Sequence, residues 1–140
     1  MFNILKYFTY LIKNIFFFNF SSPRKSNIAV FDGESLQSLK YTLEDYEYQI
    51  VESRKERIKN IYCSPKFIVI FFLCLIKLSS KRRMNLLTVY LYTVIKMTEP
   101  KIVITSICNS IKFSELARLF EEKINFIAIQ KANKYEYIQN

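Results

Sequence analysis

The chain of 140 residues contains no histidine, and this absence excludes a large part of enzyme chemistry. Without imidazole there is no Ser-His-Asp or Cys-His nucleophilic centre, no histidine acid or base, and no imidazole metal site. Glycine occurs once, at position 33, so the chain carries neither a GxGxxG dinucleotide fingerprint nor a P-loop. The three cysteines, Cys63, Cys74 and Cys108, lack metal-ligand spacing, which favours reduced thiols. We therefore expect no metal and no cofactor.

The residues that are present favour a folded domain with a basic surface. Hydrophobic residues make up 51% of the chain and aromatic residues 16%, which argues against intrinsic disorder, and the length suits one core. The net charge of +9 is compatible with an anionic membrane surface, a nucleic acid or a phosphorylated substrate. The basic residues are scattered in short groups, and no nucleic-acid-binding motif is found, so a nucleic-acid partner is disfavoured.

Residues 1–20 have the pattern of an amphipathic helix. Apolar side chains at 4, 5, 8, 11, 12 and 15 fall on one side of a helical wheel, with Lys6 and Lys13 opposite. The two lysines disfavour a membrane-spanning helix, and the stretch lacks the features of a signal peptide. Two interpretations stay open, a helix packed on its own domain and a helix lying in a membrane interface.

The rest of the chain, 27–140, alternates between apolar runs and helical patterns. Strands are predicted at 27–31, 47–53, 101–107 and 124–130, and helices at 34–43, 67–76, 84–99 and 113–120. Ten consecutive apolar residues at 67–76 are about half of what a membrane span needs, so we expect a buried helix there, with an interfacial segment as the alternative. The order predicts an α/β fold: a Rossmann-like half domain with a mostly parallel sheet of about four strands.

The loops at the carboxyl ends of these strands are where a ligand is expected. They comprise 32–35, 52–54, 106–110 and the tail after Gln130. Gly33 stands where the first strand must turn sharply into a helix. Helix capping by Asp32, by Asn109 and by Ser110 is the simpler alternative for those residues.

Several of these segments resemble one family. "FDGESLQSLKYTL", "YLYTVIKMTEPKIVIT" and "KIVITSICNSIKFSELARLFEEKINFIAIQKANKY" are similar to segments of bacterial surface-carbohydrate (polysaccharide) biosynthesis proteins of the GT-B glycosyltransferase-like kind, over about 27–137. The resemblance implies the amino-terminal lobe of a two-lobe enzyme, which shapes the acceptor side, while a second lobe holds the nucleotide sugar. It also implies that the chain is an incomplete lobe, truncated or split, and inactive alone.

The resemblance also implies which residues face the cleft. These cleft candidates are Asp32, Gly33, Glu34, Ser35, Asn109, Ser110, Gln130, Asn133 and Lys134. Asp32 or Glu34 could serve as general base or acid once a second lobe closes over it.

The partners expected on this basis are a second lobe or another copy of the chain, with a nucleotide sugar bound only in the two-lobe form. The alternative is a non-enzymatic, membrane-peripheral basic protein that acts as an interaction module on an anionic membrane. Both hypotheses place the protein in the cytoplasm, the second at the inner face of the membrane.

Overall fold

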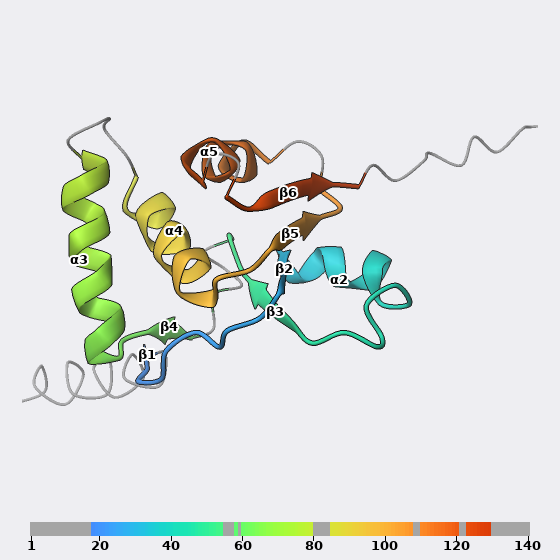
Figure 1. The fold of residues 1–140 in the computed structure, drawn as a ribbon, viewed down its shortest axis with the longest axis horizontal. Helices are drawn as coiled ribbons and strands as arrows, with labels where there is room; N and C mark the ends of the chain where they lie inside the picture. The colour runs from blue at the N-terminus through green and yellow to red at the C-terminus, as the bar shows by residue number, and fades with distance from the viewer. Residues whose placement is uncertain are drawn as a thin grey trace, which may run out of the picture.

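The structure is a computed structural model that describes residues 18–54, 58, 60–79, 85–107, 110–120 and 123–129 (Figure 1). Its elements, in chain order, are β1 (Phe18–Asn19), β2 (Ile28–Phe31), α2 (Gly33–Leu39), β3 (Tyr48–Val51), β4 (Ile61–Tyr62), α3 (Pro65–Ser79), α4 (Leu86–Thr98), β5 (Ile102–Thr105), α5 (Ile111–Phe120) and β6 (Asn125–Ala128).

Four strands form a parallel sheet in the order β3-β2-β5-β6. This confirms the α/β fold with a Rossmann-like half domain. The strands are rich in β-branched residues, which pack well on a pleated sheet. The chain passes from β2 outward to β3 and later returns to place β5 on the other side of β2. The strand order therefore reverses between β2 and β5, the switch point at which open α/β sheets bind ligands.

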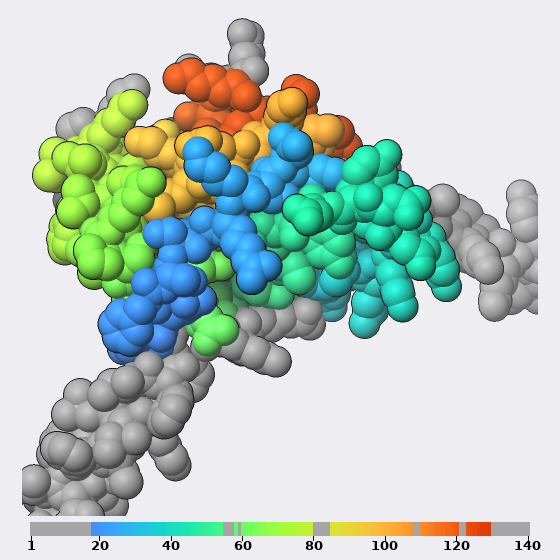
Figure 2. All heavy atoms as spheres, turned by 60° about the horizontal axis from the view of Figure 1, so that its bottom comes forward, coloured from blue at the N-terminus to red at the C-terminus, as the bar shows by residue number. Residues whose placement is uncertain are grey.

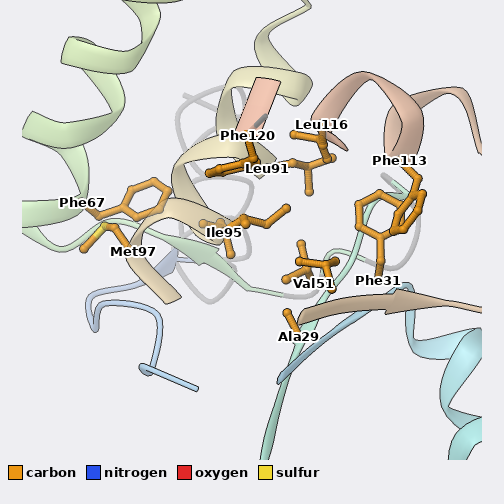
Figure 3. Packing of buried hydrophobic residues seen from close by; sticks show 12 residues of the cluster. Ala29, Phe31, Val51, Phe67, Leu91, Ile95, Met97, Phe113, Leu116 and Phe120 are labelled. Atoms are coloured by element: carbon orange, nitrogen blue, oxygen red, sulfur yellow. The ribbon is translucent and has the colours of Figure 1, made fainter. Parts of the chain in front are cut away.

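Helices cover both faces of the sheet. Val30 packs with Leu39 and Leu43 on the face that α2 covers. On the other face, side chains of α4 and α5 meet the sheet, and Figure 3 shows Leu91 and Leu116 pointing toward Phe31. This larger core comprises Ala29, Phe31, Val51, Phe67, Leu91, Val94, Ile95, Met97, Val103, Phe113, Leu116 and Phe120. Helix α4 lies between the sheet and α3, so α3 forms an outer layer (Figure 1).

Polar caps mark the starts of α3 and α4, and a proline follows the end of α4. Ser64 Oγ accepts a hydrogen bond from Phe67 N at 3.1 Å, which caps α3 just before Pro65. Asn85 caps α4 through Leu87 N, and α4 ends at Thr98, two residues before Pro100. The apolar run at 67–76 forms part of one helix, α3, but the expectation that this helix is buried is wrong for one side of it, where Ile68, Val69, Phe72, Leu73 and Ile76 are exposed because only the opposite side packs on the molecule.

A second, two-stranded sheet corrects the predicted end of the amino-terminal helix. The helical pattern was expected to continue to residue 20, but Phe18 and Asn19 form β1 and pair in parallel with Ile61 and Tyr62 of β4. Cys63 N also donates to Asn19 O at 2.7 Å. This long-range pairing overrides the helical periodicity of 18–20. The rest of the predicted helix, residues 1–17, lies outside the described residues.

In the described part of the chain, no helix combines the length and the apolar character that a membrane crossing requires.

Candidate functional site

The carboxyl edge of the sheet is held together by buried polar side chains. Asp32, which follows β2, is 2% exposed, and its Oδ1 accepts from Ser53 N at 2.9 Å and from Ser53 Oγ at 2.7 Å. Lys112, in the first turn of α5, donates from Nζ to Ser53 O at 3.1 Å. These bonds tie the ends of β2 and β3 to α5.

A second set of hydrogen bonds joins the elements at the switch point between β2 and β5. Ser35 of α2 is fully buried, and its Oγ lies 3.2 Å from Thr105 Oγ1 at the end of β5. Ser35 Oγ also contacts Phe31 O at 3.0 Å and accepts from Ser106 N at 2.9 Å. Asp32 and Ser35, both expected to face a cleft, therefore bind neighbouring elements and organise the edge.

The backbone at Asp32 has an unusual conformation. Its φ of 64° and ψ of 124° are rarely adopted by a residue with a side chain. Asp32 occupies the position before α2, but its side chain makes no capping hydrogen bond and goes to Ser53 instead. The expectation that the Asp32 side chain caps α2 is therefore wrong. The buried N–H and hydroxyl of Ser53 bind its carboxylate instead.

Beside this edge lies a cavity of about 600 Å³. Its lining combines polar and apolar side chains from α2, β3, β4, α4 and the segment between β3 and β4. The lining residues are Gly33, Ile50, Val51, Glu52, Ile58, Asn60, Tyr62, Tyr90, Leu91 and Val94. Among the described residues that were expected at the cleft, Gly33 alone lines this cavity.

Glu52 is the charged group of the cavity. Its Oε1 accepts a hydrogen bond from Gly33 N at 3.1 Å. Its Oε2 is shielded from solvent and has no hydrogen-bond partner among the described residues. A buried carboxylate oxygen without a partner is costly, and a ligand that donates a hydrogen bond would remove that cost. Glu52 is thus the strongest candidate for a ligand contact.

Gly33 allows this arrangement because it has no side chain. A Cβ at position 33 would collide with Oε1 of Glu52. The backbone φ of Gly33 is not positive, so a side chain at position 33 would disturb the close approach of the Glu52 carboxylate and not the backbone angle.

Tyr90 and Tyr62 also line the cavity. Tyr62 N donates to the Tyr90 hydroxyl at 3.3 Å, and Gln49 Nε2 donates to the Tyr62 hydroxyl at 3.1 Å. Burial raises the pKa of Tyr90 from 10.0 to about 12. The Tyr90 phenol therefore keeps its proton across the physiological pH range. In the hydrogen bond from Tyr62 N the Tyr90 oxygen is the acceptor, so that bond does not use the phenol proton.

The other expected residues fall into two groups. Glu34 pairs with Arg54 at 2.8 Å, and Ser110 caps α5 by accepting from Phe113 N at 3.3 Å. Asn109, Gln130, Asn133 and Lys134 lie outside the described residues.

Sequence reasoning placed Glu52 in a strand-end loop but did not single it out, and it missed Tyr62 and Tyr90. Tyr90 lies on the apolar stripe of α4, where it reads as a core residue. The sequence did contain one signal for Tyr90, a phenol among otherwise aliphatic side chains on this stripe, because a buried tyrosine usually needs a hydrogen-bond partner.

The described residues contain no cluster of Cys, Asp and Glu that could hold a metal ion. The described lining of the cavity offers hydrogen bonding by the Glu52 carboxylate and the tyrosine hydroxyls, and proton acceptance by Glu52.

Comparison of the chain with protein-family models, with curated proteins and with solved structures gave no match.

Proposed function

We propose that the chain is the amino-terminal, acceptor-side lobe of a glycosyltransferase-like surface-carbohydrate biosynthesis protein, and that the cavity beside β3 binds a hydroxyl-rich acceptor. The observation that carries the proposal is Oε2 of Glu52, which is shielded from solvent and unpartnered in the described structure. A sugar hydroxyl is a neutral hydrogen-bond donor of the right kind for this oxygen.

The geometry of the cavity supports a sugar in particular. Its volume of about 600 Å³ lies within the usual range for small-molecule sites. The aromatic residues Tyr62 and Tyr90 and the carboxylate of Glu52 line the same space. Sugars present both apolar ring faces and hydroxyl groups, and a site with aromatic and carboxylate groups matches both.

The position of the cavity also supports an acceptor role. Glu52 follows β3 and Gly33 follows β2, so both lie at the carboxyl edge, where α/β sheets bind their ligands. In the two-lobe arrangement that the resemblance implies, the second lobe supplies the nucleotide sugar. Glu52 lines the cavity, whereas the carboxylate of Asp32 is bound to Ser53 and does not line it, so Glu52 is the better candidate to accept the acceptor's proton.

Binding of N-acetylglucosamine, measured by saturation-transfer NMR, tests this proposal. We expect the wild-type chain to bind the sugar, and Glu52→Gln to weaken binding about tenfold, because the buried charged acceptor is lost. Gly33→Ala should weaken binding as well, because the new Cβ displaces the Glu52 carboxylate. Glu44→Gln, which removes an exposed carboxylate outside the cavity, is the matched control.

The same samples test whether the lobe is inactive alone. With UDP-N-acetylglucosamine and an acceptor sugar, the wild-type chain should release no UDP above background. Equal sugar binding by the wild-type chain, Glu52→Gln and Glu44→Gln would contradict the proposed site. Turnover by the chain alone would contradict the need for a second lobe.

A further inference from the structure

Helix α3 exposes a row of large apolar side chains to solvent. Its buried side is made by Phe67, Cys74 and Leu78. On the opposite side five large apolar side chains are between 42% and 68% exposed: Ile68, Val69, Phe72, Leu73 and Ile76. Their spacing places them on one stripe along about two turns of the helix. We call these five residues the outer stripe.

The outer stripe is unusual for a surface helix, because exposed helix faces are normally polar. Single exposed apolar residues need no explanation, but a contiguous apolar stripe marks an interaction surface. α4 separates α3 from the sheet (Figure 1), and the outer stripe lies on the side of α3 opposite its buried residues.

Charged residues border the stripe on one side. Lys66 and Lys77 are both exposed, and eleven residues apart they fall on the same edge of the helix. α3 contains no acidic residue. A helix with an apolar face and lysines along its border has the character of one that lies in a membrane interface, with its lysines at anionic head groups.

The neighbouring surface extends the apolar character. Figure 2 shows the segment that begins at β1 beside α3 on one face of the molecule. Phe18 of β1 and Ile61 of β4 are exposed there, and Phe20 is 71% exposed. Ser22 Oγ lies 2.7 Å from Ser64 Oγ, which fixes this segment beside the start of α3.

We infer that the outer stripe of α3 binds an anionic phospholipid surface, with the helix lying in the plane of the interface. At 15 residues, α3 is too short to span a bilayer. A second copy of the chain matches the surface less well, because α3 offers lysines and no carboxylates to a copy of itself. This inference goes beyond the proposed sugar site and does not depend on it.

Co-sedimentation of the full chain with vesicles tests the inference. We expect binding to vesicles of phosphatidylcholine and phosphatidylglycerol in equal parts, and weaker binding to phosphatidylcholine alone or at high salt. The double variant Phe72→Ser with Ile76→Ser should lose at least about tenfold in vesicle affinity, because it removes two large apolar groups from the stripe. Both side chains are exposed, so the fold should persist, and circular dichroism checks this.

The matched control replaces one aromatic and one aliphatic residue that are exposed elsewhere. Tyr41→Ser with Ile111→Ser changes residues that are 87% and 77% exposed and lie outside α3. It should bind vesicles as the wild type does. The inference is overturned by no binding to anionic vesicles, by equal losses in the two double variants, or by a wild-type dimer that the stripe variant converts to a monomer without any vesicle binding.

Discussion

At the scale of single residues, Asp32 is the side chain on which the carboxyl edge depends most. One oxygen of its carboxylate accepts both the backbone N–H and the hydroxyl of Ser53, at a site where water is excluded. Hydrogen bonds to a charged group are stronger than neutral ones, and unpaired buried donors are costly. Asp32 therefore contributes to stability rather than to ligand contact.

Replacing Asp32 tests this role. Asp32→Ala leaves the buried N–H and hydroxyl of Ser53 without their acceptor, and we expect a loss of about 2–4 kcal/mol in the free energy of unfolding. Asp32→Asn keeps an acceptor oxygen and tolerates the positive φ, so it should cost about half as much. Urea unfolding of both variants measures the difference. An alanine variant as stable as the wild type would show that the Ser53 contacts contribute nothing.

Tyr90 makes a pH-dependent contribution, and its direction follows from its raised pKa. Its pKa is about 12 in the folded chain and about 10 when unfolded. Below pH 10 both states keep the proton. Between about pH 10 and 12 the unfolded state loses it first, so this contribution to stability falls as the pH rises.

Tyr90→Phe removes the titrating hydroxyl, so the stability of this variant should lack the pH dependence that Tyr90 causes. At pH 7 the variant leaves Tyr62 N without its acceptor, which we expect to cost about 0.5–1.5 kcal/mol in the free energy of unfolding. The difference between wild type and variant should shrink as the pH rises from about 10 toward 12, measured by urea unfolding. Tyr41→Phe, at an exposed position outside the cavity, is the control. A difference that stays constant with pH would refute the burial of the phenol.

At the scale of elements, the strands and helices follow from local patterns. The four strands of the main sheet were predicted because each is a short apolar run next to polar turn residues. Ser64-Pro65 before α3 and Pro100 after α4 are likewise local signals, because a serine followed by proline suits a helix start and a proline suits a helix stop. The small β1-β4 sheet was not predicted, because strands of two residues carry no periodicity and the paired strands lie about 40 residues apart in the sequence.

The N-cap of α3 offers a test at this scale. Ser64 Oγ accepts from Phe67 N and also lies beside Ser22 Oγ, so it joins α3 to the segment that follows β1. We expect Ser64→Ala to lower the free energy of unfolding by about 1–2 kcal/mol. Ser79→Ala, at the exposed end of the same helix, should change it much less. Equal effects of the two variants would argue against the cap.

At the scale of the whole molecule, the candidate site combines residues that no local pattern connects. Gly33 was predicted as the turn after the first strand, and its role beside Glu52 appears only when β2 and β3 are paired. Tyr90 and Tyr62 line the cavity together, and Tyr62 N donates to the Tyr90 hydroxyl although the two residues lie on different elements, α4 and β4. Neither contact could be predicted from spacing along the chain.

The whole molecule also separates two surfaces. The cavity lies between the carboxyl edge and α4, whereas the outer stripe lies on the far side of α3. If both proposals hold, α3 rests on the membrane while the proposed sugar site stays accessible. Variants in the two regions should therefore affect sugar binding and vesicle binding independently.

The single glycine provides the most direct measurement of the central claim. A chain labelled with ¹⁵N-glycine gives one glycine amide signal, from Gly33, whose N–H donates to Glu52 Oε1. We predict that titration with N-acetylglucosamine shifts this signal saturably in the wild type and in Glu44→Gln, and that Glu52→Gln moves the midpoint of the shift to an about tenfold higher sugar concentration. A Gly33 signal that does not move in the wild type, or that moves equally in Glu52→Gln, would contradict the proposed acceptor site.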